Sequence, residues 1–296
     1  MRDRNWIRMS FVLLVAMLLA MPASAQFAGS AAASPGVDLS GSWQPMTHED
    51  QPERGQGPEL VDYAGLPITE GARQFALAWD ASRLTLPEHQ CRVHVVTYIY
   101  RGPLNLRIWE ERDPQSQQVI AIRHYISTYE QWRTIWMDGR PHPPETAPHT
   151  FMGFSTGKWE GNVLTVYTTH IKQGWIRRNG LPLSDQATLT EHYMRYGDIM
   201  THVTVIKDPV YLAEPLVKSE DFRLNTQAGL NWLYPCEPVE EIADRAPDVV
   251  PNYLPGENPF LREFADKHHI PLDAALGGPE TMYPEYQKKL KNASAQ

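Results

Sequence analysis

Histidine, arginine and glutamate side chains recur along short segments in which apolar residues alternate with polar ones. His170 ends the segment at residues 163–170, while Glu191 and Arg107 lie within two others. An imidazole beside a carboxylate in a partly dry pocket can move protons at neutral pH, because burial and neighbouring charges shift both pKa values toward that range. An arginine can hold a carboxylate or stabilise developing negative charge. We therefore predict a catalytic site with His170 as acid or base, Glu191 in support and Arg107 as anion anchor.

Aromatic side chains crowd the same region and favour an apolar or aromatic ligand. We expect Trp109, Trp175 and Tyr98, together with His124 and His149, to contact it. A cavity lined by rings with a few polar anchors suits such a compound. The competing interpretation is that the rings fill a core and that each histidine is a satisfied or outward-facing strand residue.

The elements that must position these side chains are predicted to be strands. Apolar and polar residues alternate with period two, and turn signals such as Gly197-Asp198 separate the stretches. Neighbouring hairpins pair in sequence, which predicts a mainly β protein: an antiparallel up-and-down, lipocalin-like β-barrel that closes on itself. Across the Gly197-Asp198 turn, His192 and His202 are expected to face each other. The predicted strands cover residues 95–101, 104–111, 118–126, 131–137, 151–158, 163–170, 188–196, 199–207 and 215–224.

Helices are predicted on both sides of the strand series. Thr69 is a plausible N-cap for an amphipathic helix over residues 69–80. Asn258-Pro259 begins a further helix, and a last one covers residues 279–290. A proline-rich loop at residues 141–148 is longer than an ordinary hairpin needs.

The N-terminal segment has the three-part layout of a secretory signal. Three arginines precede an apolar run too short to span a bilayer, and Ala23-Ser24-Ala25 offers a cleavage site. This predicts a periplasmic or secreted protein with no membrane insertion after cleavage. The predicted organisation is a signal peptide (1–25), a flexible arm (26–58), a barrel domain with a leading helix (59–236) and a helical tail packed on the barrel (237–296).

The charge balance restricts the partners. Cleavage would remove three arginines and one aspartate, which takes the formal net charge from −8 to −10. An acidic surface without a basic stripe argues against nucleic acid and anionic lipid as partners. A small molecule is the partner that remains.

Cys91 and Cys236 are the only cysteines. Outside the cytoplasm disulfides persist, so we predict that the two pair. The alternative is metal binding through His89, Cys91 and His94. Structural zinc needs four such ligands and no second ligand pair is evident, so no metal is predicted.

Residues 153–157 read Gly-Phe-Ser-Thr-Gly, the G-x-S-x-G pattern of serine hydrolases. That chemistry needs a strand, a strained turn and then a helix, whereas residues 158–162 read as strand and hairpin turn. Ser155 is therefore not predicted as a nucleophile. The sequence also lacks a glycine-rich phosphate loop, an H-E-x-x-H and a C-x-x-C motif, so we predict cofactor-free chemistry.

Two segments carry a resemblance to a known group. Residues 133–143 (RTIWMDGRPHP) and 152–169 (MGFSTGKWEGNVLTVYTT) resemble a widespread family of uncharacterised secreted bacterial proteins. Where that family has Glu-Gly-Asp in its turn, this chain has Glu160-Gly161-Asn162. The resemblance implies a bacterial, periplasmic setting. His170 and the Trp175 segment look like features of a narrower subset of it.

These observations favour a periplasmic enzyme that performs lyase or isomerase chemistry on a small aromatic or apolar compound inside the barrel. The alternative is a non-catalytic protein that binds a small apolar ligand. A third interpretation is a structural or envelope protein whose aromatic residues are only core.

Overall fold

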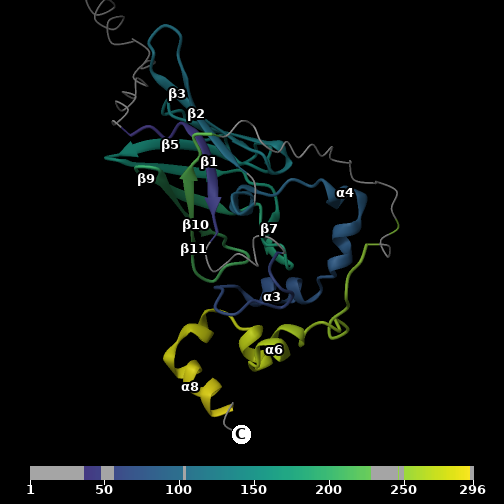
Figure 1. Ribbon diagram of the computed structural model, residues 1–296. Helices are drawn as coiled ribbons and strands as arrows, with labels where there is room; N and C mark the ends of the chain where they lie inside the picture. Colours follow the sequence, from purple (N-terminus) through teal and green to yellow (C-terminus); the bar gives the residue numbers. More distant parts are fainter. Residues whose placement is uncertain (1–36, 48–56, 103–104, 228–245, 247–249, 294–296) are drawn as a thin grey trace, which may run out of the picture. The chain divides into compact units, whose positions relative to one another are not determined.

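The protein is described by a computed structural model, which covers residues 37–47, 57–102, 105–227, 246 and 250–293. Among these residues nine strands form a closed barrel in the order β1-β11-β10-β9-β6-β5-β4-β3-β2 (Figure 1). The prediction of a mainly β protein built on a closed barrel with C-terminal helices is confirmed. The barrel strands are β1 (Gly41–Met46), β2 (Leu106–Arg112), β3 (Val119–Ile126), β4 (Gln131–Trp136), β5 (Phe154–Glu160), β6 (Val163–Thr169), β9 (Thr188–Tyr196), β10 (Ile199–Lys207) and β11 (Leu216–Leu224).

Alternation along the strands places one face of each inside the barrel. In β10, Met200, His202, Thr204 and Ile206 are buried, and the residues between them are not. The same alternation runs through β9 and β6. Because successive side chains of a strand point to opposite faces, the buried set must line the interior.

One pair of barrel strands, β4 and β5, runs parallel, with Ile135 opposite Ser155. The other neighbours in the barrel are antiparallel. A closed ring with an odd number of strands cannot alternate direction throughout, so nine strands require at least one parallel pair. A parallel pair needs a crossover rather than a tight turn. The long proline-rich loop, which lies within residues 137–153, provides that connection.

Strand β1 closes the barrel by pairing with β2 on one side and β11 on the other. The barrel therefore begins inside the predicted arm (26–58) and extends beyond the predicted limits of 59–236. The predicted signal peptide (1–25) lies outside the described residues. Cys236 does too; no described cysteine is free, and the pairing of Cys91 with Cys236 stays a prediction.

The prediction of a strand over residues 95–101 was wrong. The segment contains a short helix, α5 (Val96–Ile99), whose four residues are all buried. Val96 donates its backbone N–H to the Phe151 carbonyl, and the Lys218 ammonium donates to the Thr97 carbonyl. Packing on several sides outweighs the β propensity of valine and isoleucine.

Helix α3 (Glu70–Leu77) confirms the predicted N-cap, since the Thr69 hydroxyl accepts from the Ala72 N–H at 3.2 Å. The C-terminal helices contact this part of the chain. The Asn258 amide donates to the Leu77 carbonyl at 2.9 Å, and the Tyr63 N–H donates to the Ala275 carbonyl at 3.1 Å. The C-terminal helices are α6 (Glu263–His268), α7 (Leu272–Ala275) and α8 (Pro284–Ala293). A further short helix, α4 (Pro87–Gln90), lies between β1 and β2. In the described part of the chain, every helix is too short or too polar to cross a membrane.

Gly153 should be essential to the crossover. Its φ is +66°, and an added Cβ would lie 2.6 Å from the Thr169 carbonyl oxygen and 2.7 Å from Thr168 Cγ2. Gly153→Ala should therefore cost about 2 to 4 kcal/mol of unfolding free energy, from left-handed strain plus overpacking. The control is Gly161→Ala, where φ is +61° and no atom lies within 4 Å of the added Cβ. It should cost only about 1 kcal/mol in urea unfolding. Equal losses in the two variants would contradict the steric argument.

Candidate functional site

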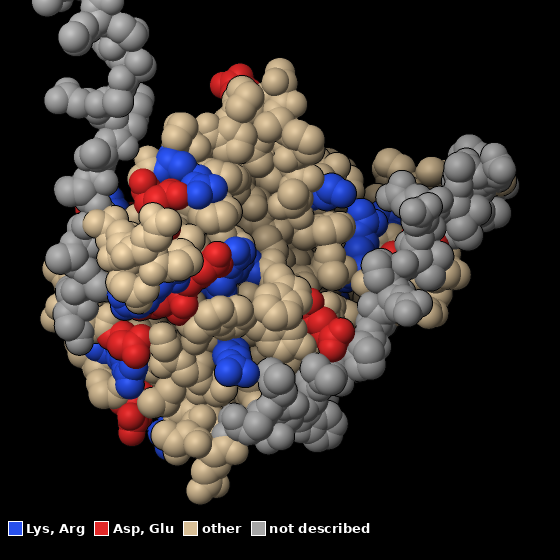
Figure 2. Space-filling model, turned by 90° about the horizontal axis from the view of Figure 1, so that it is seen from above, with Lys and Arg blue, Asp and Glu red and all other residues tan. Residues whose placement is uncertain are grey.

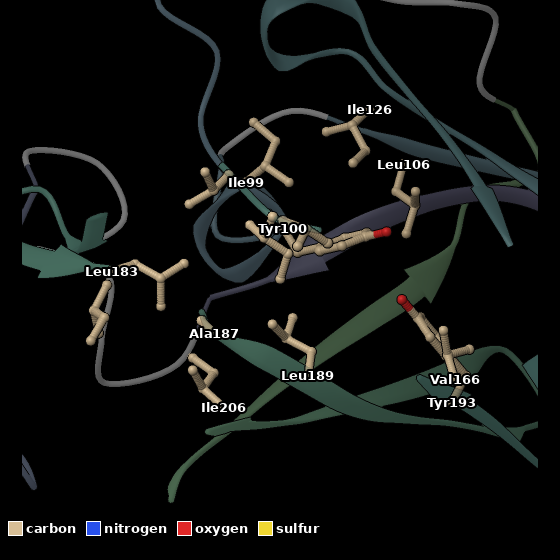
Figure 3. Close-up of a cluster of buried hydrophobic side chains, with 14 of the residues drawn as sticks. Ile99, Tyr100, Leu106, Ile126, Val166, Leu183, Ala187, Leu189, Tyr193 and Ile206 are labelled. Atoms are coloured by element: carbon tan, nitrogen blue, oxygen red, sulfur yellow. The ribbon is translucent and has the colours of Figure 1, made fainter. Parts of the chain in front are cut away.

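Seven neighbouring strands each place a polar side chain inside the barrel. We call this set the polar belt: His124, Arg133, Ser155, Thr168, Glu191, His202 and Glu220, from β3, β4, β5, β6, β9, β10 and β11 in turn. Each member is at most 5 % exposed. Tyr193 and Tyr100, the residue that follows α5, add their hydroxyls. Figure 3 shows these two hydroxyls pointing toward one another beside the apolar core.

Arg133 and Glu191 form the centre of the belt. The guanidinium holds both carboxylate oxygens, with Nη1 2.8 Å from Oε1 and Nη2 close to Oε2. It also donates to Ser155 Oγ at 3.0 Å and to Thr168 Oγ1 at 2.9 Å. Burial opposes ionisation of Glu191, but the arginine outweighs it and holds the pKa of the carboxyl far below its usual value. The carboxylate therefore stays ionised and is a weak proton acceptor.

Tyr100 connects Arg133 to His124. Arg133 Nη1 donates to the Tyr100 hydroxyl at 2.9 Å, and that hydroxyl lies 2.8 Å from His124 Nδ1. A hydroxyl has one proton and two acceptor sites, so this contact fits either tautomer of the His124 ring. Burial and the charge of Arg133 lower the pKa of His124, so the ring is neutral. Its Nε2 has no hydrogen-bond partner among the described residues.

His202 lies between two carboxylates. Its Nε2 is 3.0 Å from Glu191 Oε1, its Nδ1 is 3.8 Å from Glu220 Oε2, and its ring stacks on Tyr193 at 4.3 Å. Burial alone would lower the pKa of His202, but the two carboxylates outweigh it and raise the pKa. A protonated His202 balances part of the negative charge that Arg133 leaves uncompensated.

The structure separates the three predicted catalytic residues. Glu191 faces the interior, whereas Arg107 lies between the buried Leu106 and Ile108 on β2 and is exposed on the outer face. His170 follows β6 at a φ of +57°, with Nδ1 2.7 Å from Thr169 Oγ1 and Nε2 2.9 Å from the Pro144 carbonyl. It therefore lies against the crossover between β4 and β5, not in the belt.

The predicted ligand contacts also fall in different places. His124 belongs to the belt, and His149 lies beside His170 with ring centroids 5.2 Å apart. Trp109 packs on Trp132 at 5.8 Å, on the outer face of β2. The remaining two, Tyr98 and Trp175, lie near the pocket described below.

Some belt residues were missed or misplaced by the sequence reasoning. Arg133 was not predicted inside, although Gln131, Arg133 and Ile135 alternate with less buried residues. His192 and His202 do not face each other: the register pairs His202 with Tyr193, and His192 with Val203 on the opposite face. Ser155 lies within β5 and contacts Arg133, and the strand runs into a hairpin with β6, as expected.

A pocket of about 270 Å³ lies outside the barrel strands, beside the short hairpin of β7 (Gly174–Arg177) and β8 (Leu181–Leu183). We call it the β7 pocket. Its apolar lining includes Phe75, Val95, Phe151 and Trp175. Its ionisable lining residues are Arg83, Arg92, Arg178, His89 and His94.

The aromatic side of the pocket is held in place by ring contacts. Trp175 meets Trp79 edge to face at 4.6 Å and lies 6.3 Å from Phe75. His94 packs edge to face on Tyr98 at 5.0 Å. Burial, with a smaller contribution from Arg178, lowers the pKa of His94 to about 4, so its imidazole is neutral at neutral pH.

Neither family models, nor curated proteins, nor solved structures match the chain. Within the described ranges, His, Cys, Asp and Glu side chains form no group of three or more with the geometry to hold a metal ion. The geometry of the belt and of the β7 pocket is therefore the basis for a functional proposal.

Removing the charge of Glu191 should be strongly destabilising. Glu191→Gln leaves the Arg133 guanidinium buried without a counterion, at a cost of about 3 to 5 kcal/mol. Glu160→Gln is the control, because the Lys158–Glu160 pair is exposed to solvent and its loss should change the unfolding free energy little. Urea unfolding measures both. A loss for Glu191→Gln no larger than that of the control would contradict the assignment.

The stability contributed by His202 should depend on pH. A raised pKa in the folded state stabilises the protein below the unfolded value of about 6.5, and this contribution is lost as pH rises through the folded value. The free-energy advantage of the wild type over His202→Gln should thus be largest near pH 5.5 and smaller near pH 8.5. Chemical denaturation at each pH tests this, and an advantage that grows with pH would rule it out.

Proposed function

We propose that the protein binds a small, partly aromatic molecule in the β7 pocket, in the periplasm or outside the cell. The observation that carries the proposal is the combination of a concave volume with an aromatic wall and a few ionisable groups, which is typical of ligand sites. The wall is pre-formed, since Trp175 is fixed by Trp79 and Phe75. A ligand would therefore bind without the loss of conformational entropy that ordering these rings would cost.

The barrel supports this function as a rigid scaffold. Val95 lines the pocket, and the chain then passes through buried α5 to Tyr100, whose hydroxyl is fixed by Arg133. The pocket wall is thus tied to the polar belt by a short, fully packed segment. This arrangement gives the belt a supporting role that does not need solvent access.

The proposal predicts that Trp175→Ala weakens binding of a neutral aromatic probe such as 2-naphthamide by about tenfold or more, because a ring of the pocket wall is lost. Isothermal titration calorimetry measures the change. The matched control is Trp132→Ala, an aromatic residue on the barrel wall that does not line the pocket. Failure of the wild type to bind any naphthyl probe, or equal binding by Trp175→Ala, would refute the proposed site.

The second candidate function is the cofactor-free lyase or isomerase with its chemistry inside the barrel. One observation favours it: His124 is a neutral imidazole whose Nε2 lacks a partner and whose Nδ1 meets a tyrosine hydroxyl. Such a pair can relay a proton. The belt is closed to solvent in this structure, so catalysis would need an opening that admits the substrate.

Diethyl pyrocarbonate tests for that opening, because it modifies neutral imidazoles that it can reach. In the folded protein, mass spectrometry should show carbethoxylation of the exposed His269. If the interior opens, His124 should also be modified, at a rate below that of His269. Modification of His124 only after unfolding would exclude the interior as a catalytic site and leave the binding function unaffected.

A further inference from the structure

The charged side chains in the described lining of the β7 pocket are of one sign. Three arginines line it, and the described lining contains no aspartate or glutamate. Elsewhere the two signs are mixed, and Figure 2 shows basic and acidic side chains close together over one face. A concave, partly apolar site whose described lining holds arginines and no carboxylate attracts anions, because low-dielectric walls concentrate the field.

Arg83 is oriented toward this role. Its Nε donates to the Pro251 carbonyl at 3.3 Å, and its guanidinium lies 5.4 Å from the Trp79 ring centroid. Among the described residues these contacts engage one of its donors and one face, and its remaining N–H groups make no further hydrogen bond or ion pair there. Asp80, the nearest acid in sequence, directs one carboxylate oxygen to the Ser82 N–H and hydroxyl.

Arg92 provides the second charge. Its guanidinium makes no hydrogen bond or ion pair with another described residue, although it lines the pocket. Arg83 is close enough for the charge of Arg92 to shift its pKa. Burial is the main cause of the lowered pKa of Arg83, Asp80 opposes the shift, and the repulsion of Arg92 adds to it. An anion that binds near both guanidinium groups would relieve the repulsion between these two arginines of one pocket.

We infer that the ligand of the β7 pocket is an aromatic or apolar compound that carries one anionic group such as a carboxylate. This inference rests on the proposed function and names the class of molecule that the same site selects. The apolar body would lie against Trp175 and Phe75, and the anion would meet Arg83 and Arg92. A neutral His94 adds a hydrogen-bonding group without adding charge.

The experiment compares 2-naphthoate with 2-naphthamide, which share a body and differ in charge, by isothermal titration calorimetry at low salt. The wild type should bind the carboxylate at least about tenfold more tightly, as for a charge-assisted contact. The double variant Arg83→Gln/Arg92→Gln should lose this preference while its affinity for the amide changes less than about threefold. Added salt should weaken binding of the carboxylate more than that of the amide.

Arg262→Gln is the matched control, since this arginine lies on the exposed surface away from the pocket and its replacement should preserve the preference. Thermal melting confirms that each variant is folded. Equal affinity of the wild type for the two compounds would overturn the anion inference while leaving the pocket as a binding site. Absence of binding by both compounds would overturn the proposed function itself.

Discussion

The buried ion pair between Arg133 and Glu191 is the interaction on which the interior of this barrel depends. Taking both charges out of water costs several kcal/mol per ion, and only good geometry with further hydrogen bonds offsets that cost. Here the guanidinium reaches the carboxylate, two hydroxyl side chains and two tyrosines. The remaining polar residues of the barrel are arranged around this requirement.

The ion pair also limits what the interior can do. A carboxylate held by an arginine keeps its charge and is a poor base, so Glu191 positions its neighbours rather than accepting a proton from a substrate. Burial and the Arg133 guanidinium lower the pKa of His124. For His202 two carboxylates outweigh burial and raise the pKa. The reactive potential of the belt therefore lies in the histidines.

The sequence was informative where local rules decide the structure. The predicted segments 188–196 and 199–207 coincide with β9 and β10, because strict alternation and a Gly-Asp turn fix both limits. The Thr69 cap was predictable for the same reason. Helix α5 was not, since its valine and isoleucine favour strands and only distant packing partners hold it as a helix.

The candidate site was less predictable because it depends on long-range pairing. Alternation correctly places Arg107 on the opposite face of its strand from Leu106 and Ile108. It cannot show which face of a strand points into the barrel when both faces contain apolar residues. Arg133 and its partner Glu191 are far apart in sequence, and no local pattern indicates that a charged side chain will be buried. The β7 pocket joins α3, the segment after α4 and β7, which only the tertiary fold brings together.

The closure of the barrel by β1 has a consequence for biogenesis. Trp43 pairs with Leu224, so the first strand to be synthesised needs a neighbour that is made last among the barrel strands. The other edge of β1 can pair with β2 as soon as that strand is made, but until β11 is complete one edge of β1 stays unpaired, which is the condition under which strands associate with the wrong partner. The pairing of β1 with β11 must therefore form late. A chain interrupted before β11 would have an open sheet with unpaired edge strands that can associate with other chains.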